Sequence, residues 1–336
     1  MKKMVLVIAL VLLAGVAMIA YPYVGNYLFQ KNASQAIDVQ SKRVDSLSQT
    51  EVDNFFAAAH KYNNSLAGDP VQDPFLPGSG IVQDPNYPNI LDLGDGIMGS
   101  IEIPKIGVDL PIYHGVSPDV LDKGVGHMEA TSFPVGGKTV HTVLTGHTGM
   151  ATARLFTDLD KLAIGDTFYI HVLGQVFAYR VDNIEVVLPT QTEDLRLVLN
   201  RDLVTLVTCT PYGINTHRLF VRGTRVPYVP GMEEQAAKVS TGLSHEQILV
   251  IITAAVTAAA MGLVIAFVLL FTGRKKKREA DEAEAAAAVK EATAAEAVVA
   301  AAAMTAAEAA AARAAAVGAK PGRPEVPLVE PLDKDP

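Results

Sequence analysis

A run of apolar and β-branched residues, Leu203-Val204-Thr205-Leu206-Val207-Thr208-Cys209-Thr210-Pro211-Tyr212-Gly213, contains the only cysteine of the chain. Residues 203–208 have the composition of a β-strand, and Pro211 with Gly213 indicates a turn after it. Cys209 is therefore expected at the exit of a strand. The segment Arg218-Leu219-Phe220-Val221-Arg222, which follows the turn, predicts a second strand.

The two strands each present two faces, because successive side chains of a strand point to opposite sides. In the first strand Val204 and Leu206 form an apolar face that suits a core, and Cys209 lies on the other face. In the second strand Arg218 likewise lies opposite the apolar face. We therefore expect Cys209 and Arg218 to leave the core on the same side.

A thiol and an arginine placed in this way favour nucleophilic chemistry. A cysteine has an unperturbed pKa of about 8.5, so a nearby cation is needed to form the reactive thiolate at neutral pH. Arg218 can supply that charge, and it can also bind an oxyanion, which is worth about 3 kcal/mol for one good donor. A lone cysteine is also often a small buried apolar residue, and on these residues alone that alternative stays open.

One of the eight histidines is a candidate proton donor. His147 lies in the loop Thr145-Gly146-His147-Thr148-Gly149, directly after an expected strand. Loops at strand ends are where barrels display catalytic groups. A structural role for this histidine is the alternative.

Composition limits the classes of function. The chain has 336 residues, 49% of them hydrophobic, and a formal net charge of -8, which argues against nucleic acid as a partner. A single cysteine excludes an intramolecular disulfide framework, and the scattered histidines have no zinc-ligand spacing. We expect one main globular core, with neither a metal nor a cofactor.

Residues 96–228 read as a mainly β domain, because short apolar runs alternate with glycine, proline and aspartate. Seven or eight strands with little helix predict a closed or nearly closed barrel. A short helix is expected over Leu155–Leu162. The expected strands are Ile97–Ile103, Leu110–Tyr113, His141–Thr145, Thr167–Val172, Val176–Val187, Leu203–Thr208 and Arg218–Val226.

Residues 1–23 predict an N-terminal transmembrane anchor or signal segment. Lys2 and Lys3 precede an apolar run over Met4–Ala20, and tyrosines suited to a membrane interface close it. Gly15-Val16-Ala17 offers a cleavage site, so a removed signal peptide is the alternative. Under either reading the following residues are exported.

Residues 24–95 are expected to hold extracytoplasmic helices and a loop. Asn32–Leu66 is predicted helical in two segments, and Ser48 with Glu51 forms a capping-box pattern at the start of the second. The second segment carries an apolar side that we expect to pack on the core, formed by Val52, Phe55, Phe56 and Ala59.

A loop rich in proline and glycine follows over residues 68–80. Within it, Asp73-Pro74-Phe75 places a carboxylate and an aromatic ring two residues apart on a stiffened backbone. Such a pair suits a cationic and apolar cleft, and a plain surface loop is the alternative.

The C-terminal part predicts a membrane span and a tail. After a linker at 229–247, residues 248–271 are apolar throughout and long enough to cross a bilayer. The basic run Arg274–Arg278 places the end of this span in the cytoplasm. The globular part is then extracytoplasmic, and residues 272–336 form a basic, alanine-rich and proline-rich cytoplasmic tail.

The ordered motifs resemble those of sortases. Thr145-Gly146-His147, Thr205-Leu206-Val207-Thr208-Cys209 and Arg218 correspond to the histidine, cysteine and arginine motifs of that family, and the likeness covers roughly residues 30 to 275. Cys209-Thr210-Pro211-Tyr212-Gly213, the second span and Asp73-Pro74-Phe75 are most similar to class C, the pilin-polymerising sortases. The long tail departs from that class.

The resemblance implies a closed eight-stranded sortase-type barrel flanked by two transmembrane helices at a Gram-positive cell surface. It also implies a cysteine transpeptidase that cleaves an LPXTG-type sorting signal and transfers it to a pilin lysine. Cys209 would be the nucleophile, Arg218 the oxyanion partner and His147 the proton donor. As a lid, Asp73 would pair with Arg218 and Phe75 would cover Cys209.

Three other functions are alternatives to a pilin-polymerising sortase. A housekeeping sortase would anchor proteins to the cell wall instead of building pili. A papain-like hydrolase is disfavoured, since there the cysteine opens a helix and precedes its histidine in the chain. A membrane-held scaffold or adhesion module would carry Cys209 as an inert residue.

Overall fold

The computed structural model describes residues 2–66, 72–75, 84–232 and 245–316. The chain divides into two compact units, Met1–Leu249 and Val250–Pro336. The predicted apolar run over Met4–Ala20 includes side chains outside the described set. Parts of the loop at 68–80, of the linker and of the proline-rich end of the tail also lie outside it.

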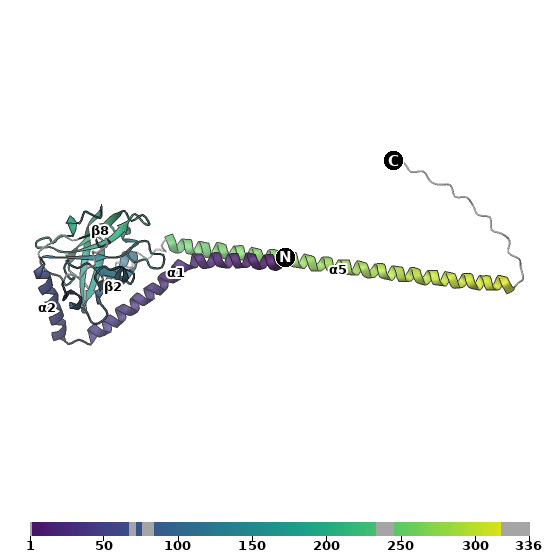
Figure 1. Cartoon of the computed structure of the whole chain (residues 1–336), viewed down its shortest axis with the longest axis horizontal. Coiled ribbons are helices and arrows are strands. Elements are labelled where there is room, and N and C mark those ends of the chain that lie inside the picture. Colours follow the sequence, from purple (N-terminus) through teal and green to yellow (C-terminus); the bar gives the residue numbers. More distant parts are fainter. Residues whose placement is uncertain (1, 67–71, 76–83, 233–244, 317–336) are drawn as a thin grey trace, which may run out of the picture. The chain divides into compact units, whose positions relative to one another are not determined.

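Eight strands close into a barrel, as the sequence predicts (Figure 1). The order around the barrel is β1-β2-β3-β4-β7-β8-β6-β5. Neighbours are antiparallel except for the parallel pairs β2 with β3 and β4 with β7. The strands are β1 (Ile97–Ile103), β2 (Val108–His114), β3 (Val125–His127), β4 (Val140–Thr145), β5 (Thr167–Val172), β6 (Gln175–Val187), β7 (Asp202–Thr210) and β8 (His217–Val226).

The apolar faces of the strands fill the barrel. Val204 and Leu206 of β7 and Val221 of β8 are fully buried in the main core. The opposite face of the same strands is also apolar in part, because Val207 and Phe220 belong to a second buried cluster. Phe75 packs against that second cluster. Both faces of the β7–β8 pair are therefore covered, which was not expected from the sequence.

Two local predictions fail. Leu155–Leu162 is not a helix, since only the 3-10 turn η3 (Leu159–Lys161) forms there. Leu155 has a φ of 37°, in the left-handed region, so a right-handed helix cannot start at that residue. Strand β3 was missed because it is only three residues long and has a glycine at its centre.

Two long helices precede the barrel. α1 (Lys2–Asp45) is continuous and includes Pro22, so the apolar N-terminal run and the first predicted helical segment form one element. α2 (Gln49–Ser65) begins with the predicted capping box of Ser48 and Glu51. Its Ala59 is fully buried in the main core, and Val52, Phe55 and Phe56 pack against that core.

Short helical turns complete the described part of this unit. They are α3 (Pro118–Leu121), η1 (Tyr87–Asn89), η2 (Pro104–Ile106) and η4 (Glu193–Leu195).

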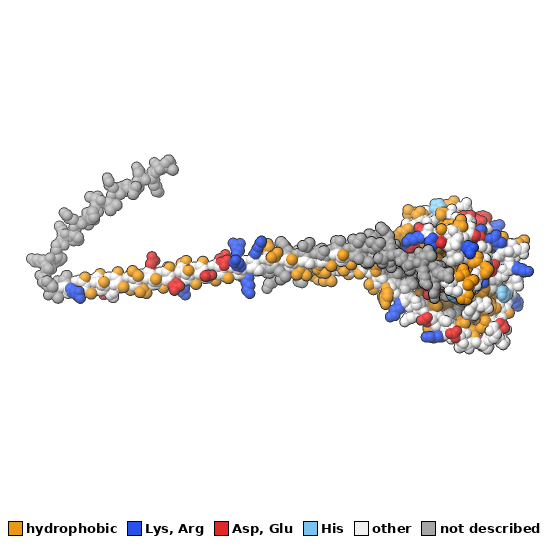
Figure 2. Space-filling model, turned by 180° about the vertical axis from the view of Figure 1, so that it is seen from behind, with side chains coloured by type: hydrophobic (Ala, Val, Ile, Leu, Met, Phe, Trp, Pro, Cys, Tyr) orange, Lys and Arg blue, Asp and Glu red, His pale blue; other side chains and the backbone are white. Residues whose placement is uncertain are grey.

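The C-terminal unit is dominated by the single helix α5 (His245–Ala316). Its segment Gly273–Arg313 is long and apolar enough to cross a membrane, the only such segment among the described residues. The span predicted at 248–271 lies in the same helix, but many of its side chains are outside the described set. Figure 2 shows a band of basic side chains on this helix, where Arg274–Arg278 are all exposed.

Candidate active site

Cys209 and Arg218 face each other on neighbouring strands. The antiparallel register of β7 and β8 pairs Cys209 directly with Arg218. Side chains of directly opposed residues lie on the same face of a sheet, about 5 Å apart at their β-carbons. The two residues that the alternation of the strands places on one side are thus direct cross-strand neighbours.

His147 reaches the same rim through the parallel pair β4 and β7. Thr145 is in register with Val207, and the Gly146 N–H donates to the Val207 carbonyl at 3.1 Å. The Thr208 hydroxyl donates to the Gly146 carbonyl at 2.7 Å. The backbone on both sides of the strand ends is therefore tied together, and His147 emerges one residue later.

The backbone at Gly146, directly before His147, lies so close to the Phe156 ring that only glycine fits there. A β-carbon at Gly146 would lie 2.8 Å from ring atoms of Phe156, which is fully buried. A larger residue would displace either the ring or the backbone that carries His147. The Thr-Gly-His motif thus has a packing reason as well as a chemical one.

The segment 72–75 lies over this rim. Asp73 accepts two hydrogen bonds from Arg218, at 2.8 Å from Nε and 2.6 Å from Nη2. The Phe75 ring lies with its centroid 5.0 Å from the guanidinium carbon of Arg218 and 5.7 Å from the ring of His147. One short segment therefore contacts both of the candidate residues that flank Cys209.

The Asp73–Arg218 pair is buried, with side-chain exposures of 1% and 7%. A two-point arginine–carboxylate contact is among the stronger ion pairs, and removing one partner leaves a buried charge without compensation. While this contact exists, Nε and Nη2 of Arg218 are occupied by a residue of the chain itself.

The surroundings disfavour charge on both Cys209 and His147. Burial raises the pKa of Cys209, Arg218 opposes that rise, and Asp73 adds to it. Burial lowers the pKa of His147, and Asp122 opposes that change. With segment 72–75 in place, the neutral thiol and the neutral imidazole are the favoured forms.

Asp122 is a site neighbour that the sequence did not suggest. It follows α3, and its Oδ1 lies 3.9 Å from Nε2 of His147. No sequence motif marks a single aspartate in a turn, so its position beside His147 is known only from the fold.

Two other histidines are buried and hydrogen-bonded, as is typical of residues with a structural role. His127 is fully buried, and burial lowers its pKa to about 3. Burial lowers the pKa of His141 to about 4, and its ring contacts the Arg196 carbonyl and the Thr205 hydroxyl. Among the described residues no group of three or more His, Cys, Asp or Glu side chains is arranged to hold a metal ion.

Comparisons with known proteins point to one family. A family model described as the sortase domain matches residues 101–226. Sortase D of Bacillus subtilis is 30% identical over 131 residues, which cover 38% of this chain and 63% of that protein. The match thus spans less than two thirds of that relative.

Solved structures give a closer likeness. The sortase C-1 structure of Actinomyces oris is 49% identical, with a TM-score of 0.51, and the match covers 53% of this chain and 99% of that one. A sortase C structure of Streptococcus pneumoniae, described in relation to catalysis and pilin substrate specificity, is 42% identical, with a TM-score of 0.55. That match covers 58% of this chain and 98% of the pneumococcal chain.

Proposed function

Because the chain belongs to the sortase family, we propose that it is a cysteine transpeptidase that cleaves an LPXTG-type sorting signal after threonine and transfers the product to a lysine amine of a pilin. The observation that carries this proposal is the cross-strand pair of Cys209 and Arg218, with His147 emerging beside the same strand.

The acylation step uses these three residues and starts from the Cys209 thiolate with a protonated His147, the pair formed when the thiol proton passes to the imidazole. The Cys209 thiolate attacks the threonine carbonyl carbon, and the guanidinium of Arg218 stabilises the resulting oxyanion. His147 donates a proton to the departing amine as the peptide bond breaks. The products are a thioester on Cys209 and a released glycine-containing peptide.

The second step exchanges the thioester for an amide. A neutral lysine amine attacks the thioester carbonyl, and the Cys209 thiolate leaves while His147 takes up the proton lost by the amine. The result is an isopeptide bond, and the enzyme returns to its starting state. The likeness to sortase C structures, one of them described for pilin substrate specificity, supports a pilin as donor and acceptor.

Segment 72–75 acts as a lid in this proposal. Asp73 occupies the nitrogen atoms of Arg218 that the oxyanion needs, and Phe75 packs against both flanking residues. Substrate and lid therefore compete for one place, so the lid must leave before acylation.

The proposed location follows from α5. We place the catalytic domain outside the cell, the span at 248–271 in the membrane and the remaining tail in the cytoplasm. The basic run Arg274–Arg278 supports this orientation. The alanine-rich stretch within Gly273–Arg313 is less suited to a bilayer, since it carries Lys290, Glu291 and Glu296.

The proposal is tested by incubating the full chain with a sorting-signal peptide. Mass spectrometry is expected to find the peptide joined to Cys209, and Cys209→Ala to form no adduct. A lysine-bearing pilin should then release the thioester. Absence of any adduct on the unaltered chain would reject the nucleophile, and single wall-linked products in cells in place of a pilin ladder would favour the housekeeping alternative.

A further inference from the structure

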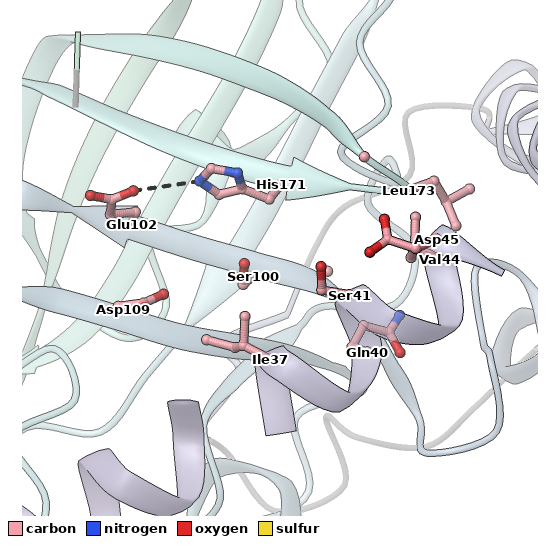
Figure 3. Close-up of a pocket in the computed structure, with 12 residues that line it drawn as sticks. Ile37, Gln40, Ser41, Val44, Asp45, Ser100, Glu102, Asp109, His171 and Leu173 are labelled. Carbon is pink, nitrogen blue, oxygen red and sulfur yellow. Dashed lines mark ion pairs between the residues drawn. The ribbon is translucent and has the colours of Figure 1, made fainter. Parts of the chain in front are cut away.

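A pocket of about 310 Å³ lies between α1 and the strands β1, β2 and β5 (Figure 3). In the closed ring of strands, β1 stands opposite β7, which carries Cys209. The pocket is therefore separate from the candidate active site, and nothing in the proposed transpeptidation uses it.

Part of the pocket wall is aliphatic. Ile37 and Val44 come from one side of α1, two turns apart, and Leu173 comes from the turn after β5. Leu173 is almost fully buried, and the other two are partly buried. Such a wall suits the methylene stem of a long side chain whose polar end lies elsewhere.

The remaining wall is polar and includes three carboxylates. Asp45 and Asp109 are exposed side chains that line the pocket, and Glu102 pairs with His171 at 3.6 Å. In Figure 3, Ser41 and Ser100 lie between Asp109 and Asp45. Neither of these two aspartates takes part in an ion pair within the part of the chain that the structure describes.

Asp45 adds a second argument for a cation. It is the last residue of α1, where the helix dipole is negative and favours positive charge. The same turn of the helix also carries Lys42 and Arg43, and Arg43 is paired with Asp95. The lining of the pocket itself holds three carboxylates, those of Asp45, Glu102 and Asp109, and neither a lysine nor an arginine.

Gln40 points independently to a missing hydrogen-bond donor. Its side chain lines the pocket, and the residue is only 7% exposed. Its Nε2 donates to the Ile97 carbonyl at 3.0 Å, which sets the orientation of the amide. Its Oε1 is buried and has no hydrogen-bond partner among the described residues. A buried acceptor without a donor is costly, so a ligand that donates there gains affinity.

We propose that this pocket binds a primary alkylammonium group, as carried by a lysine side chain of a polypeptide or by a free diamine. The aliphatic wall takes the stem, Gln40 Oε1 accepts a hydrogen bond, and Asp45 and Asp109 balance the charge. A single buried acceptor fits the compact ammonium better than the planar fork of a guanidinium.

The test uses the full chain with Cys209→Ala, held in lipid nanodiscs, and ligand-observed NMR titrations. N-acetyl-lysine methylamide is compared with the norleucine and arginine analogues, and 1,5-diaminopentane tests the free-diamine source. An ammonium probe is expected to bind at least tenfold more tightly than both analogues. Equal affinities for all probes, or no binding by any, would overturn the proposal.

Two variants locate the binding. Asp45→Asn with Asp109→Asn should weaken ammonium binding at least tenfold, whereas Asp53→Asn with Asp160→Asn removes the same charge from exposed sites elsewhere and should not. Ser41→Phe, at an exposed helix position, should block the pocket without loss of fold. Unchanged affinity in both pocket variants would reject the site. Acylation of Cys209 is measured separately in chains that retain the thiol, so each proposal can fail alone.

Discussion

At the scale of single residues, the charge of Arg218 is shared between two neighbours. Asp73 binds its guanidinium directly, while Cys209 lies across the strand pair. Asp73 also acts on Cys209, because its negative charge disfavours a thiolate that Arg218 would favour. Burial then raises the pKa of Cys209 in spite of the adjacent arginine. Arg218 therefore lowers the pKa of Cys209 less than burial raises it while segment 72–75 covers the site.

Asp122 is expected to influence the pH dependence of acylation through His147. The aspartate favours the imidazolium, so Asp122→Asn should lower the pKa of His147 further below its ordinary value. A proton donor with a lower pKa loses its proton at lower pH. In a plot of acylation rate against pH, the falling limb should therefore move to lower pH by roughly 0.2 to 0.5 pH units. The shift is small because the Asp122–His147 pair is partly exposed to solvent.

The measurement is the rate of peptide adduct formation on Cys209 against pH. Asp119→Asn removes the same charge from α3 without a contact to His147 and serves as the control. An unshifted limb in Asp122→Asn would show that this aspartate has no influence on the proton donor.

At the scale of elements, segment 72–75 resembles a bound ligand more than a connecting loop. It inserts a carboxylate and a ring into a rim formed by β4, β7 and β8, and Phe75 contributes to the second buried cluster. A connecting loop with no role at the site would not be expected to hold a buried ion pair. The contacts instead make the closed state stable until a competing group arrives.

Removal of the lid contacts should expose and activate the thiol. In Asp73→Ala with Phe75→Ala, both the burial and the negative charge that raise the pKa of Cys209 are reduced. The thiolate fraction at neutral pH should rise, and labelling by a thiol reagent should accelerate roughly tenfold, which corresponds to one pKa unit. Stopped-flow labelling of the full chain measures this rate.

Gln72→Ala changes an exposed residue of the same segment and should leave the labelling rate as it is. If the double variant reacts no faster than this control, segment 72–75 is not a lid.

The start of α2 provides a test of local stability. The Ser48 hydroxyl accepts from the Glu51 N–H, and the Glu51 carboxylate accepts from the Ser48 N–H at 2.8 Å. Ser48→Ala removes one of these bonds, and hydrogen exchange at the first turns of α2 should become roughly fivefold faster. Thr50→Ala, which leaves both bonds in place, is the matched control. Equal exchange in the two variants would contradict the importance of the capping box.

At the scale of the whole molecule, barrel closure assembles the site from distant segments. The hydrogen bond from Thr208 to Gly146 joins residues 62 positions apart, and the bonds from Arg218 to Asp73 join residues 145 positions apart. The ring order also separates the candidate active site from the pocket beside α1. On the face seen in Figure 2, the barrel unit carries acidic and basic side chains interspersed.

The single native cysteine makes the proposed membrane orientation directly testable. In a Cys209→Ala background, Asn64→Cys on α2 should react with an impermeant maleimide in intact cells, while Ala287→Cys on α5 should react only after lysis. Both positions are exposed, so access depends on the side of the membrane. Labelling of both in intact cells would place the tail outside.

The sequence by itself determined the strands β7 and β8, the side on which Cys209 and Arg218 leave them, and the cap of α2. These features depend on residues close in the chain, because strand alternation, turn residues and capping pairs act over a few positions. The family motifs also identified His147, Asp73 and Phe75, whose catalytic and lid roles stay predictions.

The tertiary structure decided which of these residues touch, because their contacts join segments that no local pattern relates. Among these contacts, the pair of Asp73 with Arg218 is also implied by the family resemblance. The ion pair of Asp73 with Arg218 and the position of Asp122 beside His147 follow from the closure of the barrel and the path of its connections. The left-handed backbone at Leu155, which prevents the predicted helix from starting there, is likewise not indicated by the local sequence pattern. The acidic pocket beside α1 likewise exists only because a helix end packs across β1, β2 and β5.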